Sequence, residues 1–199
     1  MKKLFALAAI ALAAPLTAAT PKPWTATATL APSGSYVIGN PKAKVKLIEY
    51  VSYTCPHCAH FSRESAAVLK GKMIASGSTS LEVRSSVHDR YDLVAATLAR
   101  CSGPALFPRM HDLLFARQDQ WLKQADGAGL TAIAKAAGMS DGAIAACFAK
   151  EANVASTLKV AQSIQGKISG TPAFELNGTL IENTGWAELE PNLRAVGAK

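Results

Sequence analysis

Two cysteines three positions apart are the residues of this chain that most directly offer chemistry. Cys55 and Cys58 enclose Pro56 and His57, in a chain of 199 residues with only four cysteines. At this spacing on a helix, two residues share a face and their Cα atoms lie roughly 5 Å apart, within the range that a disulfide tolerates. The pair is a candidate redox centre whose disulfide could open and close with little backbone movement.

The surroundings of Cys55 favour its ionised form. Pro56 suits the first position of a helix, so Cys55 is expected where unpaired N–H groups and the positive end of the helix dipole meet. His57 adds a hydrogen-bond donor or a positive charge, and such surroundings lower the pKa of a thiol. A stabilised thiolate makes the disulfide a stronger oxidant.

Other uses of a C-x-x-C pair require features that are weak or missing here. His60 could add a third zinc ligand, but a structural zinc site takes four ligands and no second C-x-x-C is present. Haem attachment requires a histidine directly after the second cysteine, where this chain has Ala59. A permanent disulfide stays open as an alternative, although so short a loop constrains the unfolded chain least. Redox exchange is favoured because the motif follows a strand-like run and opens a helix.

A strand and a helix are expected on either side of the pair. Val45 to Ser52 is mostly apolar and rich in β-formers, which predicts a buried strand. Apolar residues recur at helical spacing from Phe61 to Leu69. "TSLEVRSSVHD", which begins at Thr79, resembles a second strand, and a right-handed crossover would set it parallel to the first.

The flanking segments predict a short arm and a long helical block. Residues 20–35 are punctuated by prolines and predict an extended arm, with an edge strand near Thr25 to Leu30 and then a turn at "GNPKAK". From about Tyr91 to Lys167, alanine, leucine and lysine are frequent, and glycines break the run into several helices. Ser140 with Asp141 offers a cap for one of them.

The end of the chain returns to strands. Ala173 to Leu176 and Thr179 to Glu182 are predicted strands, and the Asn177-Gly178 dipeptide between them is a strong hairpin signal. A short helix from Trp186 to Ala195 is expected to close the chain.

The first residues have the three-part layout of a secretory signal. Lys2 and Lys3 precede an apolar run from Leu4 to Leu16, and small residues follow, so cleavage is expected after Ala19. The run is well short of the roughly 20 residues that a membrane span needs, and Pro15 interrupts it. Export would place the cysteines in an oxidising compartment.

Size and charge narrow the functional classes. Removal of residues 1–19 leaves 180 residues, which suits one domain with a sizeable core. The formal net charge is +7, or +5 without Lys2 and Lys3, and the basic residues are scattered with no run of five. A nucleic-acid groove is therefore not expected.

Two segments together resemble the DsbA family of thiol:disulfide oxidoreductases in the thioredoxin superfamily. "IEYVSYTCPHC" matches that family's acid, aromatic and Cys-Pro-His-Cys pattern, "GTPAF" matches its cis-proline loop, and a helical block stands between them. The resemblance implies an α/β thioredoxin fold with a helical insertion, in one domain over residues 20–199. The thioredoxin parts would be about 25–88 and 168–199, and the insertion about 89–167.

The resemblance also assigns roles around the cysteine pair. Cys55 would be the nucleophile that forms a mixed disulfide with a client protein, with His57 beside it, and Cys58 would be the more buried partner. Glu49, six residues before Cys55, matches a buried acid that manages protons near the pair. Apolar neighbours on the same strand face favour its burial, and a buried carboxylate is costly unless it is functional or paired. The alternative is an ordinary surface carboxylate.

The cis-proline loop is assigned by resemblance alone. Pro172 would be cis beside the cysteines, although only about 5% of X-Pro bonds in folded proteins are cis. Thr171 would offer main-chain groups to an extended client segment in the manner of strand addition. Many strong oxidants of the family have valine before the proline, whereas threonine is familiar in isomerase relatives and in some other branches, so the strength of oxidation stays open.

The remaining cysteines and histidines are expected to be structural. Cys101 and Cys147 lie 46 positions apart in the helical block, and pairing them would contribute roughly 4 kcal/mol in the chain-entropy model. Some DsbA-like branches carry such a second disulfide; two buried free thiols or a second exchange site are the alternatives. His88 and His111 are expected to be surface or core residues rather than metal ligands.

The resemblance implies a monomeric periplasmic enzyme that introduces disulfides into reduced, unfolded client proteins. Reoxidation would come from a membrane partner of the DsbB type, and no bound cofactor or metal is required. A disulfide isomerase or reductase is the first alternative, although the N-terminal arm has no heptads for an oligomerisation stalk. A secreted metal-handling module that uses "CPHCAH" is the second.

Overall fold

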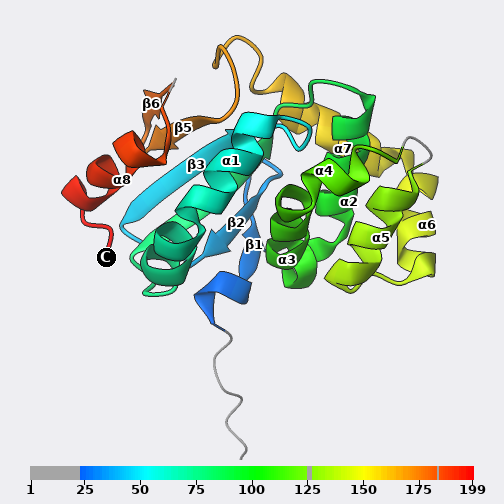
Figure 1. Cartoon of the computed structure of the whole chain (residues 1–199), viewed down its shortest axis with the longest axis horizontal. Coiled ribbons are helices and arrows are strands. Elements are labelled where there is room, and N and C mark those ends of the chain that lie inside the picture. The colour runs from blue at the N-terminus through cyan, green and yellow to red at the C-terminus, as the bar shows by residue number, and fades with distance from the viewer. Residues whose placement is uncertain (1–22, 125–126, 183) are drawn as a thin grey trace, which may run out of the picture.

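A mixed sheet with helices on both faces forms the centre of the molecule (Figure 1). The computed structural model describes residues 23–124, 127–182 and 184–199, and the predicted signal peptide, residues 1–19, lies outside them. Within the described residues, six strands pair in the order β1-β2-β4-β3-β5-β6. They are β1 (Ala28–Leu30), β2 (Tyr36–Gly39), β3 (Val45–Val51), β4 (Thr79–Ser85), β5 (Ala173–Leu176) and β6 (Thr179–Ile181).

The predicted β-α-β unit lies at the middle of this sheet. β3 and β4 are parallel, with Leu47 opposite Leu81 and Val51 opposite Ser85, whereas the other neighbouring strands are antiparallel. The connection between them is α1 (Pro56–Ser65), which continues into a π-helical stretch, η2 (Ala66–Ile74). The first residues of α1 therefore follow directly from the end of a central strand.

Alternation along β3 sends its side chains to two different cores. Leu47 and Val51 join the large core that contains α1 and the C-terminal helix α8 (Trp186–Ala195), whereas Tyr50 joins a small core beneath α7 (Glu151–Gln162). Successive residues of a strand face opposite sides of the sheet. Glu49 shares the parity of Leu47 and Val51, so the chain places this carboxylate on the α1 side.

The helical block lies to one side of the sheet in Figure 1. Ser140 caps α6 (Asp141–Ala149) by accepting a hydrogen bond from the backbone N–H of Ala143, as predicted. No single helix among the described residues is long and apolar enough to cross a membrane. By length and composition, only the bent pair of α5 (Ala128–Ala137) and α6 together meets that test. The block comprises α2 (Arg90–Cys101), α3 (Gly103–Ala116), α4 (Gln118–Trp121), α5 (Ala128–Ala137), α6 (Asp141–Ala149) and α7.

Cys101 at the end of α2 and Cys147 in α6 are joined by a disulfide in the structure, with an S–S distance of 2.02 Å and a Cα separation of 5.7 Å. This bond ties two helices of the block and lies apart from Cys55 and Cys58, which are both free thiols. Cys101 and Cys147 are therefore not free thiols in this structure, which was one of the alternatives.

The strand β2 was not predicted. Its residues, "YVIG", are too few to show an alternating pattern, and its partner β4 lies far along the chain. Gly39 at its end has φ +100°, and a Cβ atom there would lie 2.9 Å from Ile74. The C-terminal hairpin was predicted correctly: Asn177 (φ 49°) and Gly178 (φ 91°) both adopt the left-handed conformation that a two-residue turn requires.

Candidate active site

The two free cysteines lie at the first turn of α1 with unequal exposure. Cys55 is the N-cap residue and is half-buried, Pro56 occupies the first helical position, and Cys58 is 0% exposed. The helix begins here because proline fixes a helical φ and its missing N–H is not needed at that position. Only the sulfur of Cys55 is therefore open to a partner in solution.

The two thiols hold their protons very differently. A hydrogen bond with Cys58 is the largest cause that lowers the pKa of Cys55 to about 5, and the Thr171 side chain and the backbone N–H groups of Cys58 and His57 add to it, against the effect of burial. The Cys55 sulfur and burial raise the pKa of Cys58 far above its ordinary value. At neutral pH the pair thus holds one proton, on Cys58, and a thiolate on Cys55. The group of His57 that lowers the pKa of Cys55 is its backbone N–H. From the sequence, the imidazole was expected to have this effect.

The loop before β5 completes the surroundings of Cys55. The Thr171–Pro172 peptide is cis, and the Cys55 sulfur lies 3.3 Å from the carbonyl oxygen of Thr171. The hydroxyl oxygen of Thr171 is buried and has no partner of normal hydrogen-bond geometry among the described residues. The structure thus brings Thr171 and Pro172 beside Cys55, although they are more than a hundred residues apart in the sequence.

Glu49 is buried on the α1 side of β3, 2% exposed, and its Oε1 atom has no hydrogen-bond partner among the described residues. Burial raises its pKa to about 7, and the charge of Lys70 opposes that rise. Lys70 lies in η2 and pairs with Asp112 of α3, and burial lowers its own pKa to about 8. Glu49 was predicted from the sequence, whereas Lys70 was not, because it belongs to a stretch with no motif.

A buried glutamine connects the helical block to the cysteine loop. Gln118 of α4, 3% exposed, donates from Nε2 to the carbonyl oxygens of Tyr53 (2.8 Å) and Cys55 (2.9 Å). Gln118 was not predicted, because a lone glutamine in a helical block belongs to no sequence pattern. The carbonyls just before the active helix are thereby satisfied by a distant segment.

A buried carboxylate and a buried histidine hold the other side of the same loop. Asp92 of α2 accepts from the backbone N–H groups of Tyr53 (2.7 Å) and His88 (2.9 Å). His111 of α3 is 2% exposed and is hydrogen-bonded through Nδ1 to the Tyr53 hydroxyl (3.1 Å). His111 is thus a core residue and His88 an exposed one; no group of three or more His, Cys, Asp or Glu among the described residues could hold a metal ion.

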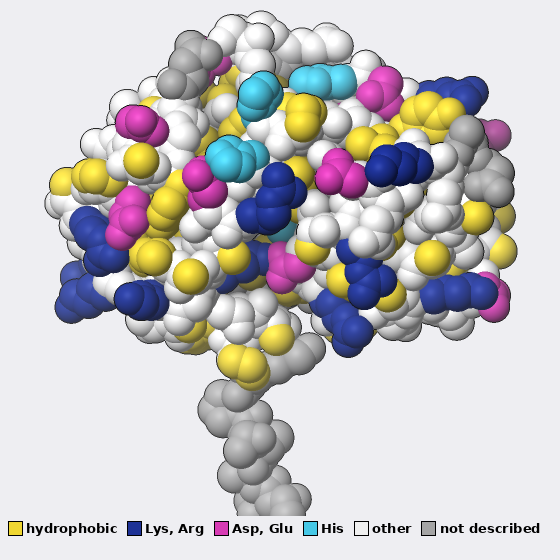
Figure 2. Space-filling model, viewed as in Figure 1, with side chains coloured by type: hydrophobic (Ala, Val, Ile, Leu, Met, Phe, Trp, Pro, Cys, Tyr) yellow, Lys and Arg dark blue, Asp and Glu magenta, His cyan; other side chains and the backbone are white. Residues whose placement is uncertain are grey.

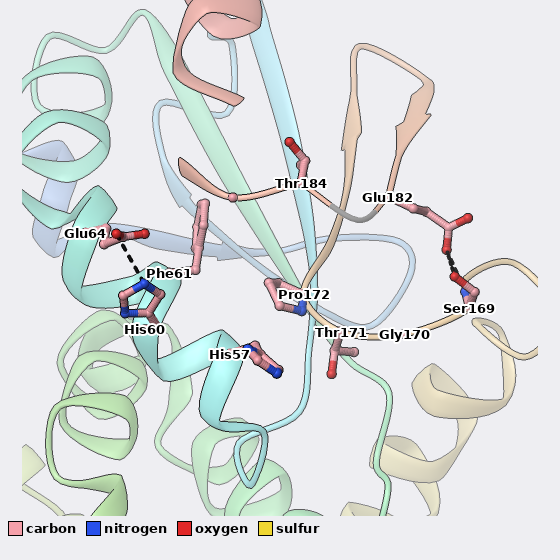
Figure 3. A pocket seen from close by; sticks show the side chains of 11 residues that line it. His57, His60, Phe61, Glu64, Ser169, Gly170, Thr171, Pro172, Glu182 and Thr184 are labelled. Carbon is pink, nitrogen blue, oxygen red and sulfur yellow. Dashed lines mark hydrogen bonds and ion pairs between the residues drawn. The ribbon is translucent and has the colours of Figure 1, made fainter. Parts of the chain in front are cut away.

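A groove of about 340 Å³ opens between α1 and the loop that contains Pro172. Figure 3 shows α1 with His57, His60 and Glu64 along one wall and the Pro172 loop opposite. In Figure 2, most of the visible His side chains lie in the upper part of the face shown, whereas Lys and Arg side chains form separate spots. This arrangement agrees with the scattered basic residues in the sequence.

Comparisons with known proteins agree with this geometry. A family model described as thioredoxin matches residues 32–194. Proteins of Rickettsia typhi and Rickettsia conorii, which carry the provisional name protein-disulfide oxidoreductase, are 35% and 34% identical over 153 residues. That alignment covers 74% of this chain but only 56% and 54% of the relatives, so the chain spans little more than half of their length.

Solved structures show the same arrangement of elements. A protein from Novosphingobium aromaticivorans, named a protein-disulfide isomerase, is 30% identical with a TM-score of 0.71; the match covers 81% of this chain and 96% of that one. Wolbachia pipientis alpha-DsbA1 is 22% identical with a TM-score of 0.74, covering 84% and 92%. The second similarity concerns the fold alone.

Proposed function

Because the chain belongs to the thioredoxin family and has a DsbA-like fold, we propose that it is a thiol:disulfide oxidoreductase that introduces disulfides into client proteins through Cys55 and Cys58. The observation that carries this proposal is the asymmetry of the pair: one sulfur is accessible with a pKa of about 5, and the other is buried and keeps its proton. Stabilisation of the thiolate favours the reduced pair, which makes its disulfide an oxidant.

The exchange begins from a disulfide between Cys55 and Cys58. A client thiolate attacks the sulfur of Cys55, the Cys55–Cys58 bond breaks, and Cys58 leaves and takes up a proton. A second client thiolate then attacks the client sulfur of the mixed disulfide, and Cys55 leaves as a thiolate. Two electrons pass from the client dithiol to the protein pair, one client proton ends on Cys58, and the other enters the solvent.

Glu49 is the proposed proton donor to Cys58 in the first step. Its charge contributes to the raised pKa of Cys58, and its own pKa of about 7 lets it hold a proton near neutral pH. A general acid is most effective when its pKa is close to the working pH. The charges of Lys70 and Glu49 interact, and the Lys70 side chain is 20% exposed. Lys70 therefore offers Glu49 a contact toward solvent.

Thr171 is the proposed docking point for the client backbone. Its carbonyl oxygen already lies against the Cys55 sulfur, and an extended segment beside it would add its main-chain hydrogen bonds next to the attacked disulfide. The periplasm is the proposed location, a membrane protein of the DsbB type the proposed oxidant, and a monomer the proposed state. Their basis is the predicted signal sequence and the family resemblance.

Isomerase or reductase activity is the second candidate. The specific observations in its favour are the similarity to the N. aromaticivorans protein and the threonine before Pro172. Equilibration of the cysteine pair with glutathione separates the candidates, because a reduction potential well above the periplasmic poise indicates a disulfide donor and a low one a reductase.

The proposed activity is tested by mixing a reduced dithiol peptide with an equal amount of the protein in which Cys55 and Cys58 form a disulfide, and measuring oxidation of the peptide. We expect one peptide disulfide for each protein disulfide consumed, and no oxidation by Cys55→Ser. Metal analysis of the reduced protein accompanies the assay. Stoichiometric zinc or copper together with no peptide oxidation would show a metal-handling protein instead.

A further inference from the structure

The groove between α1 and the Pro172 loop shares Thr171 with the surroundings of the Cys55 sulfur. Thr171, whose carbonyl oxygen lies 3.3 Å from the Cys55 sulfur, lines it together with Pro172. A client segment joined to Cys55 and lying along Thr171 therefore places the residues next to its cysteine in this groove. The groove therefore has a defined position relative to the reacting sulfur.

Carboxylates lie on two opposite walls of this groove. Glu64 lies on the α1 wall, and Glu182 lies at the end of β6, across Pro172 (Figure 3). Its described lining residues include no lysine or arginine. The groove therefore presents two carboxylates to a client without a lysine or arginine beside them.

The partners of these carboxylates leave their charges largely uncompensated. Glu182 accepts from the backbone N–H (2.6 Å) and the hydroxyl (2.9 Å) of Ser169, both neutral donors, and these bonds lower its pKa. Glu64 pairs with His60 at 3.2 Å, and both side chains are exposed, 45% and 63%. An exposed contact of this kind is weak and open to competition by a stronger cation.

Part of the surface between the two walls is apolar. Phe61, which is 3% exposed, and Pro172 lie between the Glu64 and Glu182 walls (Figure 3). Lysine and arginine have an apolar stem and a charged head, and they lay the stem on apolar surface while the head stays in water. The shape and charge of the groove fit such a side chain better than an acidic or a purely apolar one.

We propose that this protein preferentially oxidises cysteines that have lysine or arginine within two residues in the client sequence. This inference rests on the proposed disulfide exchange and adds a client class to it. A basic side chain in the groove is attracted by the carboxylates of Glu64 and Glu182, whereas an acidic side chain there is repelled by them.

Rates with three dithiol peptides test the preference. The peptides are identical except that the two residues on each side of each cysteine are all Lys, all Ala or all Glu. A neighbouring lysine also ionises the peptide thiol more readily, so each rate constant is divided by that of the same peptide with the neutral disulfide bis(2-hydroxyethyl) disulfide. At pH 8 and low salt we expect a normalised Lys-to-Glu ratio of about tenfold, since each exposed charge contact changes a rate by about two- to fivefold.

Charge-removing variants place the effect in the groove. In Glu64→Gln/Glu182→Gln the ratio should fall to about twofold or less. A glutamine oxygen can still accept the two bonds from Ser169, so the loop keeps its anchor. The matched control is Glu151→Gln/Glu190→Gln, which removes the same charge from exposed or partly exposed positions outside the groove and should keep the tenfold ratio.

The outcomes separate the client preference from the activity itself. Oxidation of the Ala peptide with a normalised Lys-to-Glu ratio near one would overturn the preference and leave the proposed function intact. A control pair that lowers the ratio as much as the groove pair does would overturn the preference in the same way. No oxidation of the Ala peptide would overturn the proposed function and the inference together.

Discussion

Glu49 is a residue whose environment opposes its charge. It is 2% exposed, one carboxylate oxygen lacks a partner, and its pKa is raised from 4.5 to about 7 by burial. Such a group is normally avoided in a protein core unless it performs a function. The function proposed for Glu49 is to store the proton of Cys58, whose pKa its charge helps to raise.

The raised pKa of Glu49 predicts a stability that depends on pH. The folded protein retains this proton up to about pH 7, whereas the unfolded chain loses it near pH 4.5, so the contribution of Glu49 to stability declines as the pH rises between these values. Glu49→Gln should therefore gain about 1–3 kcal/mol in unfolding free energy, relative to the unmodified protein, between pH 4.5 and pH 8. Urea unfolding at the two pH values measures the difference.

Glu151→Gln is the matched control for that experiment, because Glu151 is exposed at the start of α7. It should show nearly the same difference from the unmodified protein at both pH values. A pH-independent effect of Glu49→Gln would mean that the carboxyl is not held protonated in the folded protein.

At the scale of elements, the active helix depends on contacts from a separate helix. Gln118 of α4 donates to the carbonyl oxygens of Tyr53 and Cys55, just before α1. Gln118→Leu would leave the buried Tyr53 carbonyl without its donor. It would leave the Cys55 carbonyl only the N–H of Ala59, so we expect the unfolding free energy to fall by about 1–3 kcal/mol. Gln120→Leu on the exposed side of α4 should change it far less, and an equal loss from both variants would contradict this role.

The disulfide between α2 and α6 predicts a separation of stability from activity. Removal of both sulfurs in Cys101→Ala/Cys147→Ala opens a loop of 46 positions and should lower the unfolding free energy by roughly 4 kcal/mol. Peptide oxidation should persist, because Cys55 and Cys58 lie outside that loop. Loss of activity at a temperature where the variant is still folded would assign this bond to the exchange itself.

These elements also show what a sequence can predict. β3, β4, α1 and the C-terminal hairpin were predicted because each has a local pattern: a buried apolar run, helical spacing or an Asn-Gly turn. β2 was missed because a four-residue strand is defined by its partner rather than by its own sequence. The approach of Thr171 to Cys55 was expected only through the family resemblance, since no local rule brings such distant residues together.

Several supporting residues had no comparable signal. Lys70, Gln118 and Asp92 act on the site from helices whose sequences are ordinary, and their roles depend on burial and on which backbone groups they reach. Burial depends on tertiary packing, which composition and spacing do not specify. Cys55 and Cys58 could be found because a reactive pair needs one fixed spacing.

For the whole molecule, the ionised Cys55 should make the reduced protein more stable than the oxidised one. The pKa of Cys55 is lowered from 9.0 to about 5, so the reduced form gains a stabilisation that is fully present at high pH and is lost as the pH falls through about 5. Allowing for solvent screening at a partly exposed sulfur, we expect about 1–2 kcal/mol at pH 7. Urea unfolding of both redox forms at pH 7 and pH 5 measures it, and a more stable oxidised form at pH 7 would contradict the expectation.

The rate at which iodoacetamide alkylates the reduced protein, followed from pH 3 to pH 9, tests the central claim most directly. The thiolate is the reacting species, so the rate reports its population at Cys55, the accessible sulfur. We predict a half-maximal rate near pH 5, in keeping with the lowered pKa of Cys55. A midpoint between about pH 8.5 and pH 9, where an unperturbed cysteine ionises, would contradict the account.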